Sequence, residues 1–106
     1  MSDNEAKRRL IEFLDTRAFD PVLKARSQDY PEAQRAKLED VQGRTRAERE
    51  RFHEYGSARK VVDMFKGDLS SAPAKKVHRD LEALGLPTLN QLRSEFERLA
   101  DELGVG

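Results

Sequence analysis

The chain of 106 residues carries 20 basic and 20 acidic side chains, so its formal net charge is zero. Charged residues make up 38% of the sequence, against about 25% in an ordinary globular domain, which predicts well-solvated helices around a modest core. The chain contains no cysteine, and this excludes disulfides and thiolate metal ligands. The length suits a single helical domain over residues 1–106.

The N-terminal stretch favours a cytoplasmic protein. Residues 1–15, MSDNEAKRRLIEFLD, place acidic residues before the basic ones and contain only a short apolar run. A secretory signal begins with basic residues and continues with a longer apolar segment, and a membrane span needs about 20 apolar residues. We therefore expect a cytoplasmic location and no membrane partner.

A first helix is expected from Ser2 to about Arg17. Ser2 and Glu5 have the spacing of a capping box, in which each side chain bonds the backbone amide of the other residue. Pro21 lacks an amide hydrogen and disfavours helical geometry in the residue before it, so the sequence predicts a break at this point. A short second helix is expected after the break, with Asp20 as its N-cap.

Residues 31–55, PEAQRAKLEDVQGRTRAERERFHEY, are expected to form one long helix. At 1.5 Å per residue it would measure about 37 Å. One face is apolar except for a gap at Glu48, and its residues recur at spacings of three and four: Leu38, Val41, Thr45, Glu48, Phe52 and Tyr55. Gly43 weakens a helix, and a separate helix starting near Thr45 is the alternative. The apolar register continues across Gly43, which favours one unbroken helix.

The remaining helices are expected to be separated by glycine and capping residues. Gly56 is the expected left-handed end of the long helix, and Ser57 the N-cap of the next one. Gly85 has the context of a Schellman motif, in which a glycine with positive φ ends a helix. Thr88 and Gln91 have the spacing of a second capping box, which predicts the start of the last helix.

The fold class predicted by these elements is all-α. It is expected to be a compact bundle of five to six helices organised around the long helix at about residues 31–55. No alternation of β-branched residues exceeds two positions, so no strand is expected. The short connections favour antiparallel neighbours.

Charge is distributed unevenly along the chain. Residues 1–40 hold 8 basic and 9 acidic side chains, residues 41–79 hold 10 and 5, and residues 80–106 hold 2 and 6. We expect the basic middle and the acidic end to attract each other, either within one fold or across a dimer.

Metal binding and catalysis find little support in the sequence. Glu50 and His53 have the Glu-x-x-His spacing of di-iron bundles, but such sites use the motif twice. The only other histidine, His78, follows Lys75 where a glutamate is needed. The serines lie at cap positions or on charged faces, and the glycines lie singly. We expect no enzymatic activity and no cofactor, and a metal-binding bundle through Glu50 and His53 is the second alternative function.

The first alternative function is weak binding of nucleic acid or another polyanion through Arg44, Arg46, Arg49 and Arg51. On a helix, Arg44 and Arg51 lie within about 20° of each other, and Arg46 and Arg49 lie about 60° apart elsewhere. The four arginines therefore form two pairs instead of one stripe. Interleaved glutamates and the neutral net charge argue against nucleic acid.

The leading hypothesis is a protein–protein interaction or accessory module. If the shorter helices do not fully cover the long one, Leu38, Phe52 or Tyr55 is partly exposed, as a groove for a partner helix or as the seam of a weak homodimer. The alternative is a monomer whose core uses all three residues. The candidate binding surface therefore comprises the following residues: Arg44, Arg46, Arg49, Arg51, Phe52 and Tyr55.

Overall fold

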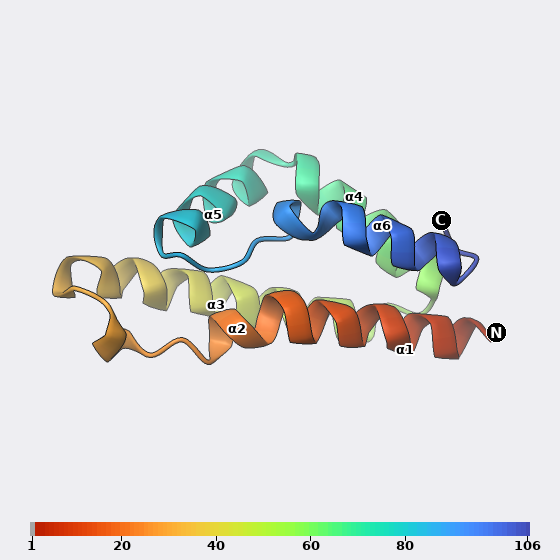
Figure 1. Ribbon diagram of the computed structural model, residues 1–106, viewed down its shortest axis with the longest axis horizontal. Helices are drawn as coiled ribbons and strands as arrows, with labels where there is room; N and C mark the ends of the chain where they lie inside the picture. Colours follow the sequence, from red (N-terminus) through yellow and green to blue (C-terminus); the bar gives the residue numbers. More distant parts are fainter. Residues whose placement is uncertain (1) are drawn as a thin grey trace.

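The computed structural model describes residues 2–106, which form an all-α fold without a strand in that range, as predicted (Figure 1). The chain forms, in order, α1 (Asp3–Leu14), the π-helical segment η1 (Asp15–Phe19), α2 (Asp20–Leu23), the 3-10 turn η2 (Ser27–Asp29), α3 (Glu32–Glu54), α4 (Ala58–Ser70), α5 (Ala72–Ala83), the 3-10 turn η3 (Asn90–Leu92) and α6 (Arg93–Glu102).

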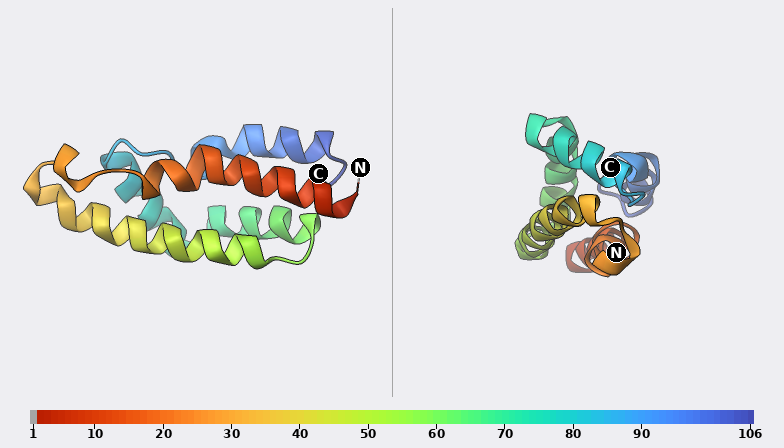
Figure 2. Two further views of the ribbon diagram at one scale, coloured as in Figure 1. Left: turned by 90° about the horizontal axis from the view of Figure 1, so that it is seen from below. Right: turned by 90° about the vertical axis from the view of Figure 1, so that its left-hand side faces the viewer.

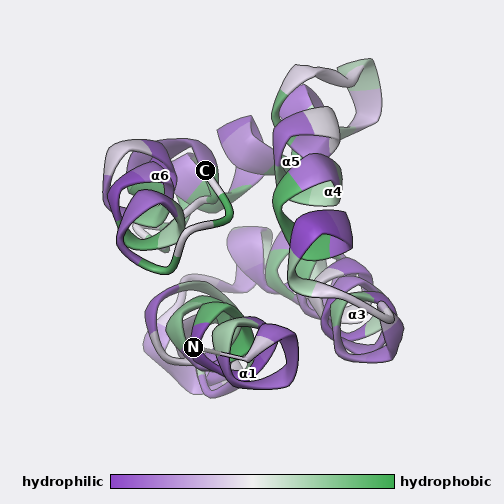
Figure 3. Cartoon of the chain, turned by 90° about the vertical axis from the view of Figure 1, so that its right-hand side faces the viewer, coloured by the Kyte–Doolittle hydropathy of each residue, from purple (hydrophilic) through white to green (hydrophobic). Residues whose placement is uncertain are grey.

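The molecule is an elongated bundle with extents of 47 × 23 × 20 Å. α1, α3, α4 and α6 run along the long axis, with hydrophobic residues toward the interior and hydrophilic residues outside (Figures 2 and 3). α5 packs against α3 at one end, and both termini lie at the opposite end (Figure 1). Within residues 2–106, no helix combines the length and the apolar composition that crossing a bilayer requires.

Buried apolar residues form two separate clusters. The larger cluster joins α1, η1, the end of α3, α4 and α6 around Leu10, Phe52 and Phe96. The smaller cluster joins α2, the first half of α3 and α5, and its buried members are Val22, Leu38, Val41, Leu81 and Leu84. α3 therefore contributes buried residues to both clusters.

The long helix is confirmed, because α3 runs unbroken through Gly43. Its predicted inner face is buried at four positions: Leu38, Val41, Thr45 and Phe52. The expectation that every other helix packs around α3 needs correction. α4 and α6 pack against α1, whereas α3 packs mainly against η1, α2, η2 and α5.

The predicted break at Pro21 is wrong, because the helical backbone continues from α1 through η1 to the end of α2. The Asp20 amide donates to the Asp15 carbonyl, five residues back, which makes this turn wider than an α-helical turn. A proline normally breaks a helix because its ring clashes with the carbonyl four residues earlier. The wider turn moves that carbonyl away, so the helix accommodates Pro21.

Two predicted helix ends are confirmed by their hydrogen bonds. Gly85 has a φ of 72°, and its amide donates to the Glu82 carbonyl at 3.0 Å, as a Schellman motif requires. Thr88 and Gln91 form the reciprocal capping box, and each side chain accepts from the other residue's amide at 3.2 Å. These local patterns fix the connection between α5 and α6.

The predicted left-handed conformation of Gly56 is wrong. Within residues 2–106, only Gly85 and Gly104 have positive φ. α3 ends instead with extended backbone at Tyr55, where ψ is 138°. Ser57 caps α4 as predicted, accepting from the Lys60 amide at 3.1 Å.

The expected attraction between the basic middle and the acidic end contributes little within this fold. In the described part of the chain, one ion pair joins residues 41–79 to residues 80–106, and it links Lys76 to Asp80 within α5. The arginines of α3 pair instead with aspartates of η1, α2, α3 itself and α4.

Candidate binding pocket

A pocket of about 380 Å³ opens between α3, the end of α4 and α5. Its apolar walls come from both core clusters, with Phe19 and Leu89 from the larger one and Val22 and Leu81 from the smaller one. Ligand pockets typically measure about 300–1,000 Å³ and combine apolar walls with a few polar groups. The junction of the two cores therefore has the size and composition of a binding site.

α3 lines the pocket with the polar residues Arg44, Glu48 and Arg51 and with Ala47 between them. Their spacings of three and four place them on one helical face. The structure therefore confirms that Arg44 and Arg51 lie on the same side of the long helix. Arg44 is also paired with Asp40 one turn earlier, at 3.2 Å between Nε and Oδ2.

Glu48 occupies the gap that the sequence shows in the buried face of α3. Its side chain is only 23% exposed. Burial, together with a hydrogen bond to Asp68 and the negative charge of Asp68, raises the pKa of the Glu48 carboxyl to about 8, although the charge of Arg51 acts in the opposite direction. The Glu48 carboxyl therefore holds its proton to a higher pH than an exposed glutamate does.

Asp68, near the end of α4, shares the Arg51 guanidinium with Glu48. Arg51 Nη2 donates to Asp68 Oδ2 at 3.0 Å and lies 3.9 Å from Glu48 Oε1. The Asp68 side chain is 18% exposed. Ionising Glu48 beside the Asp68 carboxyl in such a weakly hydrated wall, with one guanidinium next to both, is unfavourable, and this raises the pKa of Glu48.

α5 contributes His78 and Ser71 to the pocket. Burial lowers the pKa of the half-buried His78 imidazole below its usual 6.5, while nearby Glu82 and Asp68 act in the opposite direction. His78 is therefore neutral at pH 7. The Ser71 hydroxyl caps α5 by accepting from the Ala74 amide at 3.2 Å.

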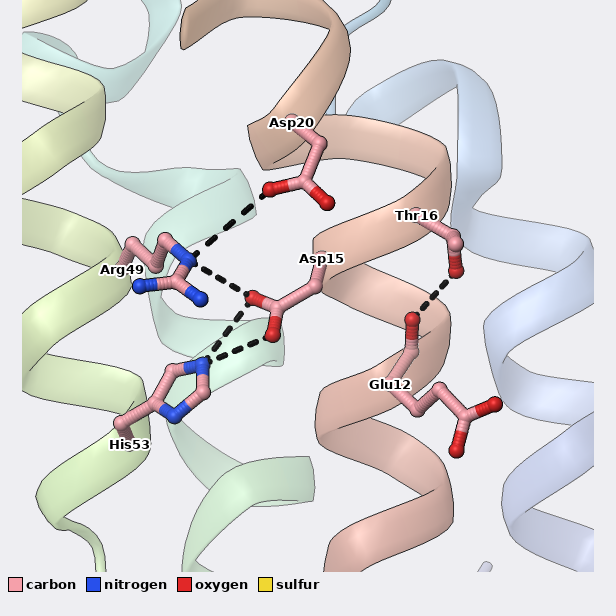
Figure 4. Close-up of polar contacts among 6 residues, drawn as sticks. All are labelled: Glu12, Asp15, Thr16, Asp20, Arg49 and His53. Atoms are coloured by element: carbon pink, nitrogen blue, oxygen red, sulfur yellow. Dashed lines mark hydrogen bonds and ion pairs between the residues drawn. The ribbon is translucent and has the colours of Figure 1, made fainter.

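A second polar cluster ties η1 and α2 to α3 (Figure 4). His53 Nε2 donates to the Asp15 carboxylate, at 2.8 Å from Oδ2 and 3.0 Å from Oδ1. Arg49 Nε lies 3.3 Å from Asp15 Oδ1 and 4.0 Å from Asp20 Oδ1. Because a π-helical turn closes over five residues, Asp15 and Asp20 lie one turn apart on the same side of the helix. These side chains are engaged with one another, which indicates a structural role.

In the structure, the partner of His53 is Asp15 and not Glu50, with which the metal-binding hypothesis pairs it. Its Nε2 bonds Asp15, and Glu50 is exposed. Among residues 2–106, no group of three or more potential ligand side chains lies together as a metal site.

The apolar members of the predicted binding surface lie mostly in the interior. Phe52 and Leu38 are 0% exposed, so the expectation that they line an open groove is wrong. Tyr55 is half-buried and packs edge-on against Phe52, with ring centroids 5.2 Å apart. Arg46 is exposed and lies outside the pocket lining.

Asp68 and His78 belong to the pocket but carry no signal in the sequence that would have identified them. Asp68 becomes a neighbour of Glu48, and His78 joins the same pocket, only when α4 and α5 fold back toward α3. The one usable signal was Glu48 itself, a charged residue on an otherwise apolar helical face.

Comparison with known proteins gives no further assignment. No protein-family model, curated protein or solved structure matches this chain.

Proposed function

We propose that this protein is a small interaction module that receives a side chain of a partner protein in the pocket between α3, α4 and α5. The pocket itself is the observation that supports this proposal. It has a volume of about 380 Å³, and both apolar residues and a compact group of charged residues line it. A cavity of about 150 Å³ holds a benzene ring. The pocket therefore has room for a large side chain together with part of its backbone.

The arrangement of the arginines argues against the polyanion alternative. Arg44, Arg49 and Arg51 each lie within 3.3 Å of an aspartate. Proteins bind nucleic acids largely because their unpaired basic groups neutralise phosphates, which releases the condensed counterions into solution. A guanidinium that is already paired contributes less to such binding.

We also propose that the protein is cytoplasmic and that it binds its partner without catalysing a reaction. The cysteine-free sequence suits a reducing compartment. In the pocket, the Ser71 hydroxyl is used as a helix cap, which supports binding more than nucleophilic chemistry.

Two matched substitutions on α3 test the pocket as the interaction site. Ala47 and Ala36 are both exposed alanines of α3, and only Ala47 lines the pocket. We expect Ala47→Phe to obstruct the pocket and Ala36→Phe to leave it open. Affinity capture from native lysate, followed by mass spectrometry, compares the two variants with the unmodified protein after circular dichroism has verified their helix content.

The proposal expects a partner that is retained by the unmodified protein and by Ala36→Phe but lost with Ala47→Phe. A partner retained equally by all three proteins would place the interaction elsewhere. Sedimentation equilibrium tests a second copy as the occupant. A dimer that Ala47→Phe abolishes would replace the foreign partner with self-association.

A further inference from the structure

We infer that the group received by the pocket is the basic side chain of a partner polypeptide, whose positive charge is held between Glu48 and Asp68. This inference rests on the proposed function, because it names the chemistry of the partner that the pocket receives. It follows from the charges in the pocket wall and from the shape of that wall.

When Glu48 and Asp68 are both ionised, the pocket lacks one cation. Arg44 of α3 is paired with Asp40 outside the pocket. Arg51 is then the guanidinium that remains for two carboxyl groups, Glu48 at 3.9 Å and Asp68 at 3.0 Å. A positively charged group entering between the carboxyls supplies the missing charge. A negatively charged group would meet Asp68 and would have to displace it from Arg51.

The walls of the pocket match the stem of a basic side chain. Lysine and arginine carry an aliphatic chain that favours apolar surroundings and a charged head that needs polar partners. Phe19, Val22 and Leu81 line the same pocket as Glu48 and Asp68. Arginine is the better fit of the two, because its planar guanidinium bonds two carboxylate oxygens at once.

Binding of such a group releases a proton. A cation beside Glu48 favours the ionised carboxylate and lowers its pKa from about 8. Affinity should then rise with pH below about pH 8, by up to about tenfold per pH unit. The charged and titratable groups that face Glu48 are Arg51 and Tyr55 of α3 and Asp68 of α4, and His78 of α5 lines the same pocket. Comparison with Glu48→Gln separates the contribution of Glu48 from theirs.

The test uses capped amino acids as probes. N-acetyl-arginine N-methylamide is compared with N-acetyl-citrulline N-methylamide, which has nearly the same shape but no charge, and with N-acetyl-glutamate N-methylamide. Binding is followed by the backbone amide chemical shifts of Glu48, Arg51, Asp68 and His78 at millimolar probe concentration. Calorimetry in two buffers of different ionisation enthalpy counts the protons released.

The inference expects the arginine probe to shift these amides at pH 7, to bind at least about tenfold more tightly than the citrulline probe, and to release protons on binding. Equal binding of the citrulline probe, or tighter binding of the glutamate probe, would overturn the inference and leave the pocket as a binding site. No binding by any probe would also overturn it, whereas the proposed function would still be decided by Ala47→Phe and Ala36→Phe.

Two variants locate the charge within the pocket. Glu48→Gln retains the size of the protonated carboxyl that the unmodified protein already holds, so it should fold and bind the arginine probe no better than the citrulline probe. Asp68→Asn should weaken arginine binding about tenfold or more as well. Full affinity in both variants would overturn the role of the two carboxyls.

Discussion

Glu48 of α3 and Asp68 of α4 stand side by side in the wall of the pocket, and Arg51 contacts both. Two carboxyl groups can share a hydrogen bond only while one of them carries a proton. The charge of the pocket therefore changes near neutral pH instead of near pH 4, where an exposed glutamate titrates. This relationship makes Glu48 the residue at which stability and binding should be measured together.

The stability of the protein should fall as the pH rises from 4.5 to about 8. In this range the folded state retains the Glu48 proton that the unfolded state has lost, so the free energy of unfolding decreases, by at most about 1.4 kcal/mol per pH unit. Glu48→Gln should lack this decrease. Urea unfolding at several pH values measures both proteins.

The contribution of Glu48 is the difference in free energy of unfolding between the unmodified protein and Glu48→Gln at each pH. The lowered pKa of His78 gives a slope of opposite sign, because the folded state holds His78 neutral. Both proteins contain His78, so its contribution cancels in the difference. Parallel pH profiles would contradict the raised pKa of Glu48.

Removing the charge of Arg51 should raise the pKa of Glu48 above 8, because Arg51 is the group that lowers it. The variant is Arg51→Gln, and the measurement is the pH dependence of the Glu48 carboxyl carbon shift. Arg46→Gln is the matched control, since Arg46 lies on the same helix but outside the pocket. A pKa that rises equally in both variants would point to net charge instead of contact.

The cluster around Asp15 should contribute more to stability than an exposed ion pair. The Asp15 side chain is 17% exposed and holds both His53 and Arg49. Asp15→Asn should lower the free energy of unfolding by about 1–2 kcal/mol. Asp40→Asn removes an exposed pair with Arg44 on α3 and should cost about 0.3 kcal/mol. Equal losses in urea unfolding would show that the cluster adds little.

Two glycines should respond to alanine with opposite signs. Gly43 lies inside α3, and a Cβ there would meet nothing within 4 Å. Gly43→Ala should therefore stabilise the protein by about 1 kcal/mol. Gly85 has a φ of 72°, so Gly85→Ala should destabilise it by about 1 kcal/mol or more. Thermal unfolding of both variants checks the pair, and a loss of stability in Gly43→Ala would be inconsistent with an unbroken α3.

Local patterns predicted those parts of the fold that depend on neighbouring residues alone. The capping box of Thr88 and Gln91 and the ending at Gly85 need only a few adjacent residues, and both form as expected. The π-helix before Pro21 was missed. Its turn places Asp15 and Asp20 against Arg49 of another helix, and this tertiary contact has no counterpart in local propensity.

The candidate site was predictable only in part, for the same reason. The sequence marked Glu48 as a gap and placed Arg44 and Arg51 on one side of a helix, because both facts follow from helical periodicity. It could not show that Asp68 faces Glu48, since that contact depends on how α4 packs. It also left open whether Phe52 is fully covered, because periodicity predicts an apolar face but not which elements pack against it.

The two separate apolar clusters imply that the two ends of the molecule have different local stabilities. Regions with fewer buried contacts open more readily in native-state amide hydrogen exchange. The smaller cluster, around Val22, Leu38 and Leu81, should therefore exchange faster than the larger one. The pocket is lined by residues of both clusters. A bound group would therefore contact both clusters at once, and its binding should slow amide hydrogen exchange in α5.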